Sequence, residues 1–151
     1  MADIELQTYS NLLQADSITN YETVLGHLVE ATGAERGCLW LENKNAFVYN
    51  GDEELRKKFP FSREAVDSVL ESGRSLLSFD TTTDSRFTPF GSIMMHNVRS
   101  CLCAACQDSS GEVLVLAYLD TSIGAEQFTE DDLQLVRNVL SFVPGAVPVT
   151  E

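Results

Sequence analysis

The feature that most constrains the fold is a pair of hairpin-like segments, one in each half of the chain. Residues 37–42 and 46–49 have the composition of strands and flank a short polar connection. Residues 100–107 and 113–120 do the same around residues 108–111, whose Asp-Ser-Ser-Gly sequence suits a tight turn. Strands joined by such short connections pair antiparallel, because a parallel pair needs a long crossover. The sequence therefore predicts a mostly antiparallel sheet.

Helical patterns lie before, between and after these strands. The second helix has capping-box spacing at Thr19 and Glu22, and Gly33 suits its left-handed C-cap. The last helix opens after Thr129 with three acids at the positive end of its dipole. The predicted helices span residues 3–15, 19–33, 62–72 and 129–142, and a further strand spans residues 75–79. Helices placed around hairpin-joined strands indicate an α+β fold.

The charge balance narrows the classes of partner. Ten Lys and Arg against 23 Asp and Glu give a formal net charge of −13 over 151 residues, which repels nucleic-acid backbones and anionic membrane surfaces. Residues 56–99 are the exception, because seven basic and five acidic side chains leave them at +2 against −15 elsewhere. With no leader-like start and no long apolar run, we expect a soluble, cytoplasmic protein.

The four cysteines are expected to be reduced and buried. Cys101 and Cys103 share one face of a predicted strand and Cys106 falls on the other, so the three thiolates would not converge on an ion. We therefore predict no bound metal, no cofactor and no disulfide. The sequence also lacks the motifs of hydrolases, metalloenzymes and phosphate-binding loops, which favours a non-enzymatic role.

Several segments, in their order and spacing, resemble those of a family of regulatory modules. They are residues 70–80, 84–87, 98–102, 111–120 and 128–133, with Asp84-Ser-Arg-Phe87 among them. Together they resemble a GAF domain of bacterial signalling proteins over residues 18–143, between an N-terminal helix in residues 1–17 and a tail or linker stub in residues 144–151. The resemblance implies terminal helices on one face of the sheet and a middle segment that encloses a small-molecule pocket on the other.

Three departures from the family limit the choice of ligand. GAF domains that bind cyclic nucleotides have an Asn-Lys pair where this chain has Asp120 and Thr121, although Phe128 and Asp132 match. Bilin-binding members use a cysteine followed by histidine, and His96 does not follow a cysteine. The cysteines also lack the spacing of GAF-type reductases of free methionine sulfoxide. All three activities are disfavoured.

The resemblance and the local positive charge place a ligand beneath residues 79–100. We expect Arg99 and Asp80 to hold its polar groups, and Trp40 to face the same side if Leu39 and Leu41 pack on the helices. The positive balance predicts a small ligand that is anionic or strongly polar. The predicted contacts are Trp40, Phe79, Asp80, Phe87, Phe90, Met94, Met95, Arg99 and Ser100. The alternative is that Arg99 pairs with Asp80 and the aromatic side chains are ordinary core.

The predicted function is a non-enzymatic sensory or regulatory domain that binds a small molecule, mediates dimerisation, or both. The alternative is a ligandless structural dimerisation module. A homodimer is expected because the polar stripe of the last helix leaves a wider apolar arc than one sheet face needs. That stripe consists of Gln134, Arg137, Asn138 and Ser141. Otherwise the first helix covers the excess within one chain through Ile4, Leu6, Leu12 and Leu13.

Overall fold

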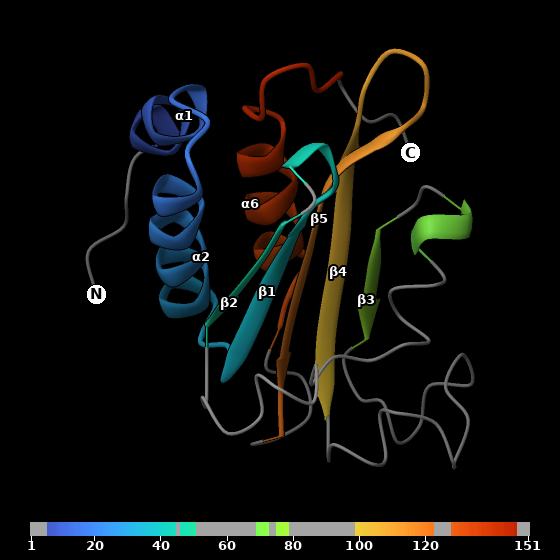
Figure 1. Ribbon diagram of the computed structural model, residues 1–151. Helices are drawn as coiled ribbons and strands as arrows, with labels where there is room; N and C mark the ends of the chain where they lie inside the picture. Colours follow the sequence, from blue (N-terminus) through green and yellow to red (C-terminus); the bar gives the residue numbers. More distant parts are fainter. Residues whose placement is uncertain are drawn as a thin grey trace.

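The structure is a computed structural model in which the helices near the two ends of the chain pack on one side of a twisted sheet (Figure 1). It describes residues 6–44, 46–50, 69–72, 75–78, 99–122 and 128–147. The strands are β1 (Arg36–Leu41), β2 (Ala46–Asn50), β3 (Leu76–Ser78), β4 (Ser100–Gln107) and β5 (Val113–Thr121). The helices are α1 (Leu6–Gln14), α2 (Ile18–Thr32) and α6 (Glu130–Leu140), with a short 3-10 helix, η1 (Glu42–Lys44).

The described strands form one antiparallel sheet in the order β2-β1-β5-β4-β3. β1 and β2 form a hairpin through η1, and β4 and β5 form another through a turn in which Gly111 has a φ of 90°. β1 also pairs with β5, which lies far from it in sequence, and this pairing sets Arg36 opposite Asp120. Both predicted hairpins and the predicted α+β fold are confirmed.

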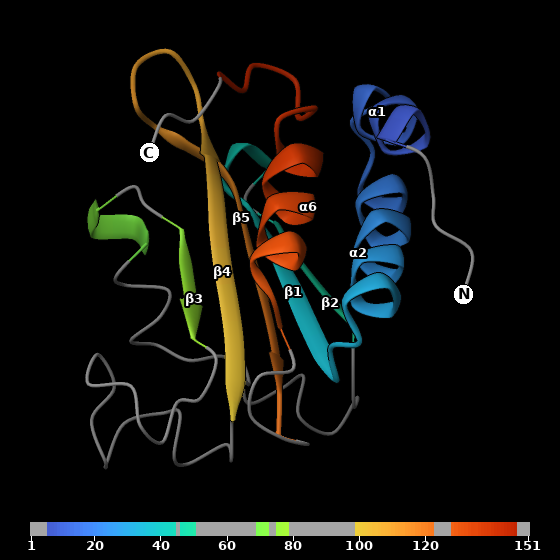
Figure 2. The ribbon, with the colours of Figure 1, turned by 180° about the vertical axis from the view of Figure 1, so that it is seen from behind.

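The two faces of the sheet have different neighbours. Helices α1, α2 and α6 lie on one face, which we call the helix face (Figure 2). Leu39 and Leu41 point to the helix face, which meets the condition under which Trp40 was expected on the other side, and Cys38 points to that other side. We call that other side the opposite face. Its buried residues include Cys38, Val69, Leu76, Cys101, Cys103, Leu116 and Tyr118.

Helix caps explain where α2 and α6 begin. The side chain of Ser17 caps α2 by accepting a hydrogen bond from the Asn20 amide, so the helix begins one residue later, at Ile18. The predicted capping box at Thr19 is therefore wrong, because the side-chain cap forms two residues earlier. At α6, Thr129 and Asp132 form a full capping box. Asp132, a position shared with cyclic-nucleotide-binding GAF domains, thus has a structural role here.

The apolar arc of α6 is covered within one chain. Its buried side chains are Leu133, Val136, Val139 and Leu140, and the partly buried Leu135 and Phe142 pack against the same core. From α1, Tyr9 and Leu13 are each 1% exposed and belong to that core as well. The structure thus favours the alternative in which the first helix covers apolar surface through Leu12 and Leu13, although Leu6 is 43% exposed and Ile4 lies outside the described residues. The homodimer stays a prediction, but the apolar arc of α6 no longer supports it.

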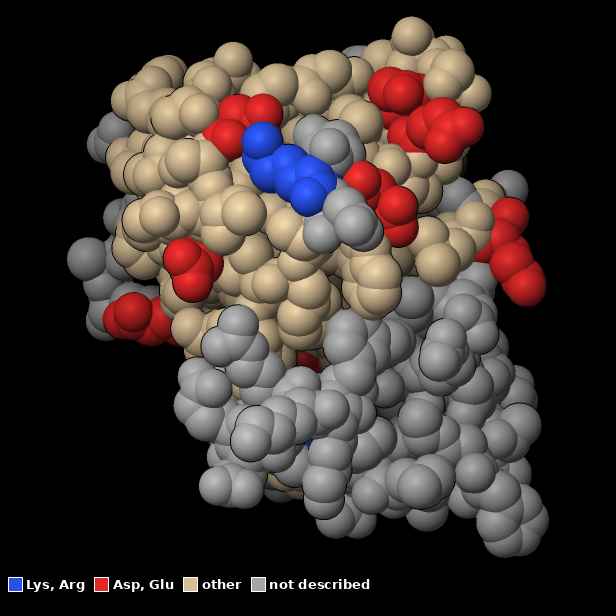
Figure 3. Space-filling model, in the orientation of Figure 1, with Lys and Arg blue, Asp and Glu red and all other residues tan. Residues whose placement is uncertain are grey.

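Charge on the described surface follows the composition. The described residues include twelve Asp and Glu but only four Lys and Arg, and acidic side chains are scattered over the view in Figure 3. Within those residues, no helix combines the length and the apolar character that crossing a membrane requires. The predicted middle helix is described only at residues 69–72, which are helical.

Candidate functional site

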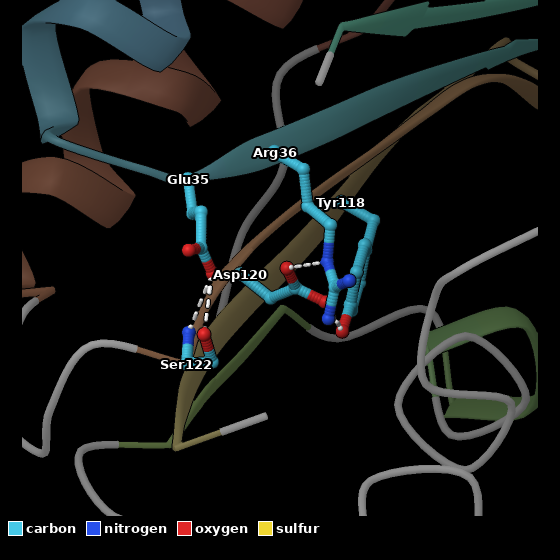
Figure 4. A network of polar contacts seen from close by, with 5 residues as sticks. All are labelled: Glu35, Arg36, Tyr118, Asp120 and Ser122. Atoms are coloured by element: carbon cyan, nitrogen blue, oxygen red, sulfur yellow. Dashed lines mark hydrogen bonds and ion pairs between the residues drawn. The ribbon is translucent and has the colours of Figure 1, made fainter. Parts of the chain in front are cut away.

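A buried polar network lies on the opposite face, where β1 meets β5. Arg36 donates from Nε to Oδ1 of Asp120 at 2.6 Å, and the Tyr118 hydroxyl donates to Oδ2 at 2.6 Å (Figure 4). Strand alternation places Arg36, Tyr118 and Asp120 on the side of Cys38, away from the three helices. The Asp120 side chain is fully buried and Arg36 is only 6% exposed. The face on which the resemblance implies a ligand pocket therefore carries a buried ion pair.

Burial and pairing act on this network in opposite directions. Desolvation raises the pKa of Asp120 to about 6, although the charge of Arg36 and the hydrogen bonds from Arg36 and Tyr118 oppose that shift. For Arg36, burial lowers the pKa, whereas the charge and the hydrogen bond of Asp120 raise it. The net shift of the Arg36 pKa is upward, so the guanidinium stays charged. A buried carboxyl with a specific charged partner occurs at functional sites and also in structural ion-pair networks.

A second contact fixes the end of β5 beside the network. Oε1 of Glu35 accepts hydrogen bonds from the Ser122 amide at 3.0 Å and from its hydroxyl at 2.7 Å (Figure 4). These bonds lower the pKa of Glu35, so it remains a carboxylate. The Glu35 amide also donates to the carbonyl oxygen of Asp120 at 3.0 Å. Glu35, which precedes β1, thereby holds the end of β5 next to the ion pair.

The thiols divide between the two faces as the sequence predicts. Cys38, Cys101 and Cys103 lie on the opposite face and Cys106 on the helix face, and all four are buried and free. Burial raises the pKa of Cys38 and Cys103, and raises that of Cys106 to about 11. Among the described residues, no group of three or more Cys, His, Asp or Glu could hold a metal ion. Protonated thiols of this kind are weak nucleophiles.

Three of the predicted ligand contacts are described. Trp40 lies on the opposite face, 38% exposed, with its ring edge-to-face to Phe47 at 5.8 Å between centroids. Arg99 is half-buried immediately before β4, and its amide donates to the Thr121 carbonyl at 2.8 Å. The predicted contacts Phe79, Asp80, Phe87, Phe90, Met94 and Met95 lie outside the described residues.

The direction of the Ser100 side chain argues against its predicted role as a ligand contact. It precedes Cys101 on β4, so strand alternation turns it to the helix face together with Leu102. Its hydroxyl is buried and donates to the Ser78 carbonyl oxygen at 3.0 Å. Ser100 and Trp40 therefore lie on different faces of the sheet.

Sequence reasoning did not single out Arg36 or Tyr118, and it treated Asp120 only as a departure from a family motif. A signal was present, because Arg36 and Asp120 are charged residues at the ends of otherwise apolar strands. Charged side chains at such positions are rarely buried unless they are paired. What the sequence lacks is the strand order that makes them neighbours.

The fold and sequence together identify the family. A family model for the GAF domain matches residues 16–146, and the chain belongs to this family of small-molecule-binding regulatory modules. No curated protein matches the chain's sequence. Phe128, another position shared with cyclic-nucleotide-binding members, is fully buried in the core of the helix face.

Solved structures with the same fold differ in activity. The GAF domain region of a Geobacter sulfurreducens PCA protein has a TM-score of 0.66 at 12% identity, over 94% of this chain and 97% of that one. The GAF domain of an Acinetobacter phosphoenolpyruvate-protein phosphotransferase has a TM-score of 0.64 at 12% identity, over 96% of this chain and 93% of that one. The free methionine-R-sulfoxide reductase of Neisseria meningitidis, solved with its substrate, has a TM-score of 0.58 at 15% identity, over 96% and 93%. These similarities establish the fold alone, and they include an enzyme.

Proposed function

We propose that this chain is a non-enzymatic sensory or regulatory domain of bacterial signal transduction, which binds a small polar molecule on the opposite face of its sheet. The observation that carries the proposal is the buried ion pair of Arg36 and Asp120 on that face. A buried ion pair costs much of its attraction in desolvation, so it is weak evidence for a purely stabilising role. Its position on the face that the family uses for ligands favours a role in binding.

Arg99 supports an anionic ligand. Cys101 and Cys103 point to the opposite face, and the same alternation continued one step places Arg99 on that side. A guanidinium can hold a carboxylate or phosphate through two parallel hydrogen bonds. The basic balance of residues 56–99 would attract such a group locally, although the chain as a whole is acidic.

A titration of nucleotides and carboxylate metabolites tests the proposal. Trp40 is the only tryptophan and lies on the opposite face, so its emission is expected to change when a ligand binds there. At about a hundred times its dissociation constant, a ligand should stabilise the fold by about 2.7 kcal/mol, which raises the melting temperature. Arg99→Ala should abolish both signals, whereas Arg137→Ala, on α6, should retain the emission change. If no compound changes either signal, the ligandless dimerisation module is the better account.

The thiols provide a test of the non-enzymatic assignment. Because burial raises the pKa of Cys38 and Cys103, we expect less than about one iodoacetamide label per native chain at neutral pH. After unfolding in urea, all four cysteines should be labelled. Mass spectrometry counts the labels. Rapid native labelling of Cys38, Cys101 or Cys103 would contradict the assignment and favour thiol chemistry.

A further inference from the structure

A buried serine on β3 points to the same side of the sheet as the ion pair of Arg36 and Asp120. Ser78 lies opposite Cys101 of β4, and side chains directly opposite each other in an antiparallel pair point to one face. Cys101 belongs to the core of the opposite face, so the Ser78 side chain points there too. Ser78 is 0% exposed. Its hydroxyl is thus enclosed on the face where the ligand is proposed to bind.

The Ser78 hydroxyl has no hydrogen-bond partner in the part of the chain that the structure describes. Other buried hydroxyls have one, because Thr32 donates to a backbone carbonyl, and Tyr21 and Tyr118 donate to carboxylates. Ser100 donates to the carbonyl oxygen of Ser78 itself. A buried hydroxyl without a partner lowers stability and is rare in native folds. Its presence therefore points to a bound group that supplies the missing partner.

Ser78 stands at one end of a row of side chains that crosses four strands of the opposite face. The row consists of Ser78 on β3, Cys101 on β4, Asp120 on β5 and Arg36 on β1. Neighbouring strands are about 4.8 Å apart, so Ser78 and Asp120, two strands apart, are separated by roughly 10 Å. The unpartnered hydroxyl and the buried ion pair therefore lie within the span of one small molecule.

We propose that the Ser78 hydroxyl donates a hydrogen bond to an anionic oxygen of the ligand, such as that of a carboxylate or a phosphate. This inference rests on the proposed function, because it assigns a contact to the ligand of the opposite face. A serine hydroxyl can donate one hydrogen bond, and a bond to an ionised acceptor is roughly twice as strong as one between neutral groups. The bond to the ligand would satisfy the hydroxyl that the fold leaves without a partner.

Two buried serines form a matched pair for the first test, which needs no ligand. Ser78→Ala removes a hydroxyl without a partner, so its midpoint of urea denaturation should equal or exceed that of the wild type. Ser100→Ala removes the donor to the Ser78 carbonyl oxygen and should lower the midpoint. A clearly lower midpoint for Ser78→Ala would overturn the proposal, because the hydroxyl would then have a partner within the fold.

Inorganic phosphate and acetate are the probes for the second test, because each carries one kind of anionic oxygen. With ¹⁵N-labelled protein at constant ionic strength, at least one anion at millimolar concentration should produce saturable shifts of the Ser78 and Cys101 backbone amide signals. The anion that binds identifies the acceptor as phosphate or carboxylate. Ser78→Ala should bind it at least about fivefold more weakly. Ser100→Ala should bind it as the wild type does, because that side chain lies on the helix face.

Failure of this inference is distinct from failure of the proposed function. Saturable binding with equal affinity in the wild type and in Ser78→Ala would leave a ligand site on the opposite face but remove Ser78 from it. The absence of saturable shifts with both anions would overturn the Ser78 contact. The proposed function fails as well only if no compound of the earlier titration changes the emission of Trp40 or the melting temperature.

Discussion

Replacing Asp120 with alanine is expected to lower the free energy of unfolding by about 3–5 kcal/mol. The substitution leaves the Arg36 guanidinium, 6% exposed, without its carboxylate, and it removes the acceptor of the Tyr118 hydroxyl. An uncompensated buried charge costs far more than the pair contributes. Urea denaturation at pH 7.5, followed by Trp40 emission and by circular dichroism, measures the loss.

Two variants isolate the cause of that loss. Lys44→Ala removes the more exposed ion pair with Asp16, whose N–O distance is 3.2 Å, and should cost less than about 1 kcal/mol. The double variant Arg36→Met with Asp120→Ala removes both charges and should recover part of the stability. A loss in Asp120→Ala no larger than that in Lys44→Ala would contradict the burial of the pair.

Phe128→Ala is expected to cost a similar amount, about 3–5 kcal/mol, for a different reason. The ring is fully buried in the core of the helix face, immediately before the Thr129 cap of α6. Its removal leaves a cavity and releases the start of the helix from the core. The same urea denaturation measures the change in the free energy of unfolding.

Phe142, at the other end of α6, provides the matched control. It is only half-buried, so Phe142→Ala should destabilise the fold clearly less than Phe128→Ala. Equal losses for the two variants would show that Phe128 is not the core anchor described. A ligand on the opposite face should still bind to Phe128→Ala, because the ring points to the helix face.

The sequence by itself determined the local elements and their faces. Alternation puts Leu39 and Leu41 on one face and Trp40 on the other, and it separates Cys103 from Cys106, whereas only the structure shows that the helices cover the face of Leu39 and Leu41. Short polar connections specify the hairpins, and Thr129 marks the start of α6. These features follow from backbone geometry, since successive side chains of a strand point to opposite faces and helix starts need side-chain caps.

The tertiary structure decided what long-range packing controls. Arg36 and Asp120 are 84 positions apart and become partners because β1 lies next to β5, which no local pattern specifies. The wide apolar arc of α6 suggested a dimer, but α1 covers part of that surface and belongs to the same core. Within the polar stripe of α6, Gln134 and Ser141 are exposed as periodicity predicts, whereas Arg137 and Asn138 are half-buried beside the end of β4 and the segment that follows α6. Periodicity fixes which way a side chain points, whereas its partner depends on which elements pack there.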